Sequence, residues 1–229
     1  MKAIFFDFDG TLTYKSENIW RAIWEACGYD LGKGSIYRDL FDAYLNKQLS
    51  YQDWCDRTCD EFYRAGFNKK QLAEIADKIT LIDGLEETLK ALKDEGYSIH
   101  IVSGNITPVV ARVLGKNLKY FDSINANGMF FNSDGVCDYI RGTNYDFEGK
   151  ARFINEYKNQ TKSKAVDLVF VGNGSNDEWA HQSGCKTICI NPDDADYFDT
   201  TKWHTVLQNV NNLTDILPIL GLQSQQEQQ

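Results

Sequence analysis

The chain has 229 residues, of which 42% are hydrophobic and 25% are charged, a balance that is typical of a folded globular protein and argues against a disordered or fibrous one. Asp and Glu number 33 against 24 Lys and Arg, so the formal net charge is −9. This charge disfavours general binding to nucleic acids or to anionic membranes, because both carry negative phosphates. We therefore expect no nucleic acid and no membrane as partners.

Two further features concern the cellular compartment. The apolar run at residues 3–8 is interrupted by Asp7, and no basic segment precedes a long apolar stretch, so we expect neither a membrane span nor a secretory signal. The six cysteines include no C-x-x-C pair. We therefore expect reduced thiols in a cytoplasmic protein.

The first third of the chain changes from a strand pattern to a helical one. The apolar run at residues 2–8 predicts a buried strand that ends at Asp-Gly-Thr. Apolar residues then recur at helical spacing, which predicts helices over 16–28, 35–46, 50–65 and 68–79. Ser50 and Asp53 resemble a capping box, and Asn68 is a good helix-capping residue. Residues 14–83 are therefore expected to be all-helical.

From residue 84 onward, predicted helices and strands alternate. Helices are expected over 85–96, from 107, over 150–158 and over 213–220, and a short one is expected after the loop at 172–177. Strands are expected at 97–102, 166–171 and 186–190, with a small hairpin within 124–141. This alternation predicts an α/β fold with a parallel sheet and right-handed crossovers.

Polar residues follow three of the predicted strands. Asp7 and Asp9 lie at the end of the first strand and Ser103 follows the strand at 97–102, while the loop at 172–177 ends in Asp177. Ligands of open α/β sheets bind at the carboxyl ends of the strands, so these residues are expected to meet. Neighbouring carboxylates repel one another unless a cation or a shared proton offsets the charge, and such an oxygen-rich set suits Mg²⁺. The alternative is ordinary turn chemistry, in which Asp and Gly are common.

Together these segments resemble the haloacid dehalogenase superfamily of phosphohydrolases, and in particular its phosphoserine-phosphatase-like subgroup. Asp7-Phe8-Asp9-Gly10-Thr11-Leu12-Thr13 is similar to the first motif of that family, and Ile101-Val102-Ser103-Gly104 to the second. Lys150 resembles the third motif, and Gly172-Asn173-Gly174-Ser175-Asn176-Asp177 the fourth. The resemblance implies a Rossmann-like parallel sheet core, residues 1–13 and 84–221, with an all-helical cap, residues 14–83. Residues 222–229 are expected to form a disordered polar tail.

The resemblance also implies a Mg²⁺-dependent phosphomonoesterase that hydrolyses a small phosphorylated metabolite through an aspartyl-phosphate. Asp7 would be the nucleophile, Asp9 the general acid and base, and Lys150 a neutralising cation. The phosphoryl group would be bound by Ser103, Gly104 and Asn176. The Mg²⁺ ion would be held by Asp7, Asp9, Asn173 and Asp177.

Three positions leave alternatives open. Asn173 stands where the family usually has Asp, which removes a formal charge, so we expect either a weak metal site or a compensating acid such as Glu178. Glu17 lies near the position of a substrate-binding Glu in phosphoserine phosphatases, with the spacing shifted by one. Arg57 roughly matches their carboxylate-binding Arg, or else it is an exposed partner of Asp53.

These alternatives lead to different functions. The substrate is phosphoserine or another phosphometabolite such as a sugar phosphate, a methionine-salvage intermediate or phosphocholine. A further alternative is a weakened member of the family that binds phosphate without turnover because of Asn173. The sequence does not define the oligomeric state.

Overall fold

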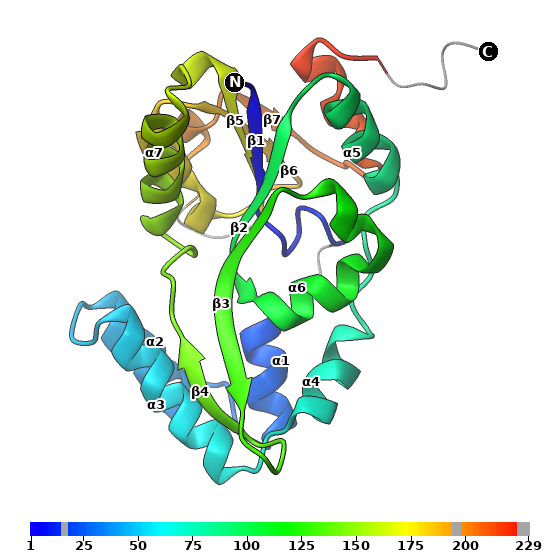
Figure 1. Cartoon of the computed structure of the whole chain (residues 1–229). Helices are drawn as coiled ribbons and strands as arrows, with labels where there is room; N and C mark the ends of the chain where they lie inside the picture. The colour runs from blue at the N-terminus through cyan, green and yellow to red at the C-terminus, as the bar shows by residue number, and fades with distance from the viewer. Residues whose placement is uncertain (15–17, 194–197, 224–229) are drawn as a thin grey trace.

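The computed structural model describes residues 1–14, 18–193 and 198–223, which form a single seven-stranded sheet with helices on both faces (Figure 1). The strands are β1 (Ala3–Phe6), β2 (Ser98–Ile106), β3 (Ser123–Phe131), β4 (Cys137–Arg141), β5 (Leu168–Gly172), β6 (Lys186–Ile190) and β7 (Thr205–Leu207). Their order is β4-β3-β2-β1-β5-β6-β7. Every neighbouring pair is parallel except β3 and β4, so the predicted α/β class and parallel sheet core are confirmed.

Side chains of β1 alternate between two hydrophobic cores. Ile4 and Phe6 belong to the core that contains Leu89 of helix α5 (Leu85–Asp94). Ala3 and Phe5 belong to the opposite core, which contains Ile154 of helix α7 (Gly149–Thr161). A central parallel strand is buried on both faces, which explains why this segment reads as an uninterrupted apolar run.

A second group of helices extends from the end of β1. It comprises α1 (Ile19–Ala26), α2 (Ile36–Leu45), α3 (Tyr51–Arg64) and α4 (Lys69–Ala76). The predicted capping box at Ser50 and Asp53 is confirmed, and Asn68 caps α4. The chain leaves the sheet for this helical group after Thr13 and returns at Leu81. These two residues lie side by side, because they form an isolated antiparallel β-bridge.

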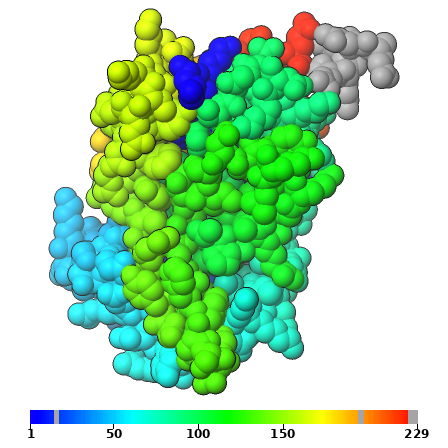
Figure 2. Space-filling model, viewed as in Figure 1, coloured from blue at the N-terminus to red at the C-terminus, as the bar shows by residue number. Residues whose placement is uncertain are grey.

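The β3–β4 hairpin joins this helical group. Met129 and Ile140 lie in the same hydrophobic core as Trp24 and Phe62, and Asn68 bridges to Val136. In Figure 2 the green hairpin lies between the cyan helices α2 and α3 on one side and α4 on the other. This core is therefore built from residues of the helical group together with the hairpin and with Ile106 and Val109, where β2 ends and α6 (Thr107–Leu114) begins. We refer to the four helices α1–α4 as the cap.

Several elements differ from the expectations. Strand β2 continues to Ile106, past the predicted end at 102, because it pairs with β3 again at Asn127 after a shift in register. The expected helix over 213–220 is two short 3-10 helices, and Pro218 opens the second. The short edge strand β7 was missed, since its three residues carry no periodic pattern.

The remaining helices are short or lie between strands. They are α6 (Thr107–Leu114), η1 (Gly115–Tyr120), η2 (Ala165–Asp167), η3 (Ser175–Ser183), η4 (Thr200–Lys202), η5 (Leu213–Ile216) and η6 (Pro218–Leu220). Among the described residues, none of the helices has the length and apolar character needed to span a bilayer. All six cysteines are free thiols. Most of the predicted tail lies outside the described residues, at 224–229.

Candidate active site

The two aspartates of the first motif are placed by a tight turn at the carboxyl end of β1. Asp7 is still aligned with the sheet, because its backbone N–H donates to the Val171 carbonyl of β5 at 2.9 Å. The chain then turns through Gly10, which has φ +72°. A Cβ atom at Gly10 would lie 2.5 Å from the side-chain nitrogen of Asn173, so both the conformation and the close approach require glycine. This turn brings the fourth motif against the first.

Lys150 connects the first, third and fourth motifs. Its side chain is fully buried, and its Nζ lies 2.9 Å from Oδ1 of Asp7 and forms a second short contact with Oδ1 of Asp177. The other oxygen of Asp177 accepts the backbone N–H groups of Asn173 (2.8 Å) and Gly174 (3.0 Å). A buried ammonium is retained only where carboxylates compensate it, so these three side chains form one unit.

Asn105 is a site residue that the motif analysis did not single out. Its side-chain nitrogen lies 2.9 Å from both carboxylate oxygens of Asp9. The register shift in β2 falls between Val102 and Ile106 and therefore spans this residue and Ser103. Ser103 is buried, and its Oγ accepts the backbone N–H of Asn105 at 3.2 Å.

Asp7, Asp9 and Ser103 line a cavity of about 210 Å³, which we call the carboxylate cavity. It is lined by Asp7, Asp9, Gly10, Asn18, Ser103, Asp146, Asn173, Gly174, Asn176 and Asp193. The predicted motif residues Asp7, Asp9, Ser103, Asn173 and Asn176 are thus brought together. Asp146, Asp193 and Asn18 had no signal in the motif pattern, because each comes from a loop or a helix cap.

Asp146 packs against the second motif. A Cβ atom at Gly104 would lie 2.2 Å from the Asp146 carboxyl group, so glycine at 104 makes room for it. The side-chain nitrogen of Asn176 donates to Oδ1 of Asp146 at 3.2 Å. The Gly104 carbonyl accepts hydrogen bonds from Trp20 of α1 (2.9 Å) and from Asn127 (2.7 Å), which fix the end of the second motif.

The pKa values of the groups at the cavity are shifted, because several carboxyl groups lie around the single ammonium group of Lys150. Burial raises the pKa of Asp7 to about 8, and the charge of Asp177 adds to this effect against the opposing charge of Lys150. Burial also raises the pKa of Asp9 to about 7, although the hydrogen bond from Asn105 favours its charged form. The pKa of Asp146 is raised, mainly by burial. Burial disfavours the charged form of Lys150, but the carboxylates prevail and its pKa is raised.

The lining of the carboxylate cavity offers oxygen atoms that could hold a divalent cation. Asp7, Asp9 and Asn173 line one small cavity, and the carboxylate, carbonyl and amide oxygens that these residues carry are of the kind that suits Mg²⁺. The side-chain oxygen of Asn173 also accepts a hydrogen bond from the Thr11 hydroxyl at 3.4 Å. Both oxygens of Asp177 are already engaged, by Lys150 and by two backbone N–H groups. In the part of the chain that the structure describes, no three His, Cys, Asp or Glu side chains converge on a common metal position. The donors that fit are therefore a mixed set of carboxylate, amide and carbonyl oxygens.

The remaining predicted residues lie elsewhere. Arg57 is on the exposed face of α3 and is not among the residues that line the cavity. Glu17 lies outside the described residues. Glu178 accepts a short hydrogen bond from the backbone N–H of Asp199 and does not line the cavity, so this side chain is not placed to replace the charge missing at Asn173.

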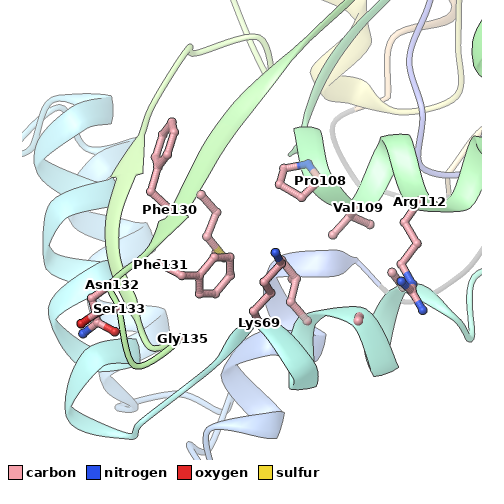
Figure 3. Close-up of a pocket in the computed structure, with 13 residues that line it drawn as sticks. Lys69, Pro108, Val109, Arg112, Phe130, Phe131, Asn132, Ser133 and Gly135 are labelled. Atoms are coloured by element: carbon pink, nitrogen blue, oxygen red, sulfur yellow. The ribbon is translucent and has the colours of Figure 1, made fainter.

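A larger cavity of about 540 Å³ lies between α4, α6 and the β3–β4 hairpin (Figure 3). Its walls are mainly apolar, with Val109, Phe130 and Phe131 among the labelled side chains. Among the described residues that line it there is no Asp, Glu, His or Cys, and Arg112 is paired with Asp77 at 2.6 Å. Hydrolytic chemistry requires a nucleophile and a proton donor or acceptor, which places the candidate active site at the carboxylate cavity.

An α/β sheet with a buried Asp–Lys–Asp unit at the carboxyl ends of its strands defines a hydrolase-type site. The sequence matches the haloacid dehalogenase-like hydrolase family over residues 4–178. The chain therefore belongs to this family.

The relatives by sequence include two phosphoserine phosphatases. A phosphoserine phosphatase of Archaeoglobus fulgidus is 24% identical over 178 residues, which cover 77% of this chain and 48% of that protein. A phosphoserine phosphatase of Methanocaldococcus jannaschii is 26% identical over 176 residues, which cover 77% of this chain and 79% of that protein. The chain thus spans about half the length of the first relative and most of the second.

Solved structures share the fold. A phospho-aspartyl intermediate analogue of phosphoserine phosphatase has a TM-score of 0.72 at 20% identity, covering 95% of this chain and 98% of that chain. A hydrolase of the same family from Salmonella enterica serovar Typhi has a TM-score of 0.72 at 18% identity, covering 94% of this chain and 69% of that chain. The likeness extends over the cap as well as the sheet, since nearly the whole chain is covered.

Proposed function

We propose that this chain is a phosphomonoesterase that uses Asp7 as a covalent nucleophile. The observation that carries the proposal is the position of Lys150, a fully buried ammonium held between Asp7 and Asp177. This arrangement places a fixed positive charge beside a carboxylate that opens onto the cavity. A fixed cation of this kind stabilises the negative charge of a transferring phosphoryl group.

In the first half of the reaction, a carboxylate oxygen of Asp7 attacks phosphorus and the bond to the substrate's alcohol oxygen breaks. Asp9 donates its proton to that leaving oxygen. A pKa of about 7 leaves a proton on Asp9 in a substantial fraction of molecules near neutral pH. Asp7, whose pKa burial raises to about 8, must be ionised to attack, and the charge of Lys150 together with a bound cation would favour that form. Asn105 holds the Asp9 carboxyl group in place by contacting both of its oxygens.

In the second half, water attacks the phosphorus of the aspartyl-phosphate and the bond to Asp7 breaks. Asp9, now ionised, accepts a proton from that water, which restores both carboxyl groups to their starting states. Ser103 and Asn176 line the cavity beside Asp7, where they would hydrogen-bond the phosphoryl oxygens. Splitting one displacement into two steps is the general advantage of a covalent intermediate.

The cofactor proposed for this site is Mg²⁺. Asp7, the backbone carbonyl of Asp9 and the side-chain oxygen of Asn173 would hold it, with Asp177 behind them as the partner of Lys150. When bound, the cation would neutralise charge on the phosphoryl group. The raised pKa values of Asp7 and Asp9 support a cation here, because uncompensated charge is part of their cause.

The substrate would be a small phosphorylated metabolite. The two relatives are named phosphoserine phosphatases, which makes phosphoserine the first compound to test. Arg57 would bind a substrate carboxylate only if the exposed face of α3 turned toward the cavity, so the proposal does not depend on it. The cavity volume of about 210 Å³ suits a small ligand.

The test is release of phosphate from p-nitrophenyl phosphate with and without Mg²⁺. We expect turnover that requires the cation and is lost in Asp7→Asn, a change that keeps the shape of the side chain and removes the attacking anion. A phosphate-binding protein without turnover is the competing function, favoured by Asn173. Retention of phosphate binding without any hydrolysis at saturating Mg²⁺ would support that alternative and overturn ours.

A further inference from the structure

Two cysteines from distant parts of the chain meet in the hydrophobic core that the cap shares with the β3–β4 hairpin. The sulfur of Cys59, on α3, lies 3.8 Å from the sulfur of Cys137, the first residue of β4, and these two elements lie side by side (Figure 1). The residues are 78 positions apart in the sequence, so the tertiary fold creates the contact. Both side chains are buried, and Cys59 is 5% exposed whereas Cys137 is fully enclosed.

Backbone contacts hold the two sulfurs in this arrangement. The N–H of Cys137 donates to the Phe67 carbonyl at 2.8 Å, and the neighbouring Val136 forms a bridge with Asn68. Residues 67 and 68 connect α3 to α4, so the start of β4 is anchored to the turn that follows the helix carrying Cys59. A disulfide requires the sulfurs to approach to about 2.05 Å, which is a short further displacement of two side chains that already face each other.

Cys59 also differs chemically from the other thiols. The hydrogen bond between the two thiols favours the Cys59 thiolate and lowers the pKa of Cys59. Burial instead raises the pKa of Cys27 to about 12 and that of Cys185 to about 11. The thiolate is the form that reacts with oxidants, so Cys59 is suited to be the attacking sulfur.

We propose that Cys59 and Cys137 form a reversible oxidation site that closes to a disulfide when the protein meets a peroxide. The Cys59 thiolate attacks an oxygen of hydrogen peroxide, the O–O bond breaks, and the released hydroxide takes up a proton to become water, which leaves a sulfenic acid on Cys59. The Cys137 sulfur then attacks the Cys59 sulfur, the S–O bond breaks, and hydroxide leaves with the Cys137 proton as a second water. Two thiols thereby lose two electrons, and one peroxide is reduced to two water molecules.

The disulfide would tie the cap to the edge of the sheet. Cys59 belongs to a cap helix, and Cys137 belongs to β4, which is the outermost strand. A covalent bond across so many residues removes conformations from the unfolded chain and therefore raises the melting temperature. Neither cysteine is among the described residues that line the carboxylate cavity, so oxidation of this pair is independent of the proposed phosphatase function.

Peptide mapping of the whole chain identifies the bond directly. Reduced protein is treated with hydrogen peroxide, the remaining thiols are alkylated, and the product is digested with trypsin without reduction. Because Arg57 separates Cys55 from Cys59, the tryptic peptides 58–64 and 120–141 each contain one cysteine. We expect these two peptides to be cross-linked and to be released by dithiothreitol, while the other cysteines are recovered in the alkylated form.

Thermal melting measures what the bond does to the fold. Oxidation should raise the Tm of the wild type by about 5–15 °C. Cys55→Ala is the matched control, because it removes a thiol one turn earlier on α3 and should keep both the cross-link and the shift in Tm. Cys59→Ala and Cys137→Ala should lose both. Melting of each reduced variant shows whether its fold is intact, and the peptide map of the wild type does not depend on any variant.

Three results would overturn the role of this pair. The first is native protein without the cross-linked peptides 58–64 and 120–141 at a peroxide dose that oxidises glutathione in the same solution. The second is a cross-link that joins Cys55 to Cys137, or one that forms only in urea, since the native contact would then not direct the reaction. The third is an unchanged Tm in protein that carries the cross-link. All three are read without a phosphatase assay, so they leave the proposed function untouched.

Discussion

The side-chain nitrogen of Asn105 lies 2.9 Å from each carboxylate oxygen of Asp9. This contact favours the charged form of Asp9 and so opposes the effect of burial on its pKa. In Asn105→Ala the pKa of Asp9 should therefore rise. Since Asp9 must be protonated to release the alcohol, activity falls as the pH rises through its pKa, and this alkaline limb should move to higher pH.

The measurement is kcat/KM against pH for the wild type and Asn105→Ala. Asn125→Ala is the matched control, because its amide bonds the Ile101 carbonyl at 2.9 Å and does not line the cavity. A limb that moves to lower pH in Asn105→Ala, or equally in both variants, would contradict the pairing of Asn105 with Asp9.

Lys150 is expected to contribute to stability as well as to catalysis. Lys150→Met leaves Asp7 and Asp177 buried without their cation, and breaking a buried ion pair in this way costs about 3–5 kcal/mol. Unfolding in urea measures the loss, and phosphatase activity should fall by orders of magnitude. Lys158→Met on the same helix loses a single bond to the Ser183 carbonyl, which contributes about 0.5–1.5 kcal/mol. Equal stability losses in the two variants would contradict the bridging role of Lys150.

Asn173→Asp should tighten the binding of Mg²⁺. A carboxylate binds this cation more strongly than an amide oxygen, and residue 173 lines the cavity next to Asp7. Titration calorimetry with Mg²⁺ measures the change directly. Glu178→Gln is the control and should bind Mg²⁺ as the wild type does, because Glu178 bonds the Asp199 backbone outside the cavity. Unchanged affinity in Asn173→Asp would place the cation elsewhere.

His100 makes stability depend on pH away from the active site. Burial lowers the pKa of this imidazole from 6.5 to about 4, and its ring stacks on Phe5 with centroids 5.3 Å apart. Between these values the unfolded chain binds a proton that the folded chain does not. The free energy of unfolding should therefore fall as the pH drops from 6.5 to about 4, by at most about 1.4 kcal/mol per unit.

The comparison is urea unfolding of the wild type and His100→Phe from pH 4.5 to 7 without added cation. Asp7 and Asp9 act in the opposite direction, since a raised pKa in the folded state costs stability as the pH rises. Both aspartates are present in both proteins, so the difference between the curves reports His100. A difference that is constant across this pH range would contradict the assignment.

The short motifs at strand ends name residues that the structure brings to one cavity. Asp7, Ser103 and Asn176 line it together, because parallel strands end at the same edge of a sheet, and their roles in the site stay predictions. Asn105 was missed although it is adjacent to the second motif, because its role depends on a register shift in β2 that hydrophobic patterning does not encode. Asp146 was missed because its place depends on long-range hydrogen bonds such as Tyr44 to Asn144.

In the fold, too, features with a local sequence signal were predicted and features that depend on long-range contacts were not. Residues with local signals were predicted closely, such as Ser50, which caps α3, and the strand at Lys186–Ile190. The hairpin was predicted, but its packing against α3 and α4 was not, because the apolar residues Met129 and Ile140 carry no information about which core they enter. Asp177 was predicted to be a metal ligand, but one of its oxygens contacts the ammonium group of Lys150. This contact joins residues far apart in the sequence, so the motif pattern does not reveal it.

The central claim is that Asp7 becomes phosphorylated during turnover. The most direct measurement is to quench the enzyme in acid during hydrolysis of ³²P-labelled p-nitrophenyl phosphate, reduce the acyl phosphate with borohydride, and identify the modified residue by peptide mass spectrometry. We predict labelled protein in the wild type, reduction of residue 7 to homoserine, and no label in Asp7→Asn. Sustained turnover without label at residue 7, or the same label in Asp7→Asn, would contradict the mechanism.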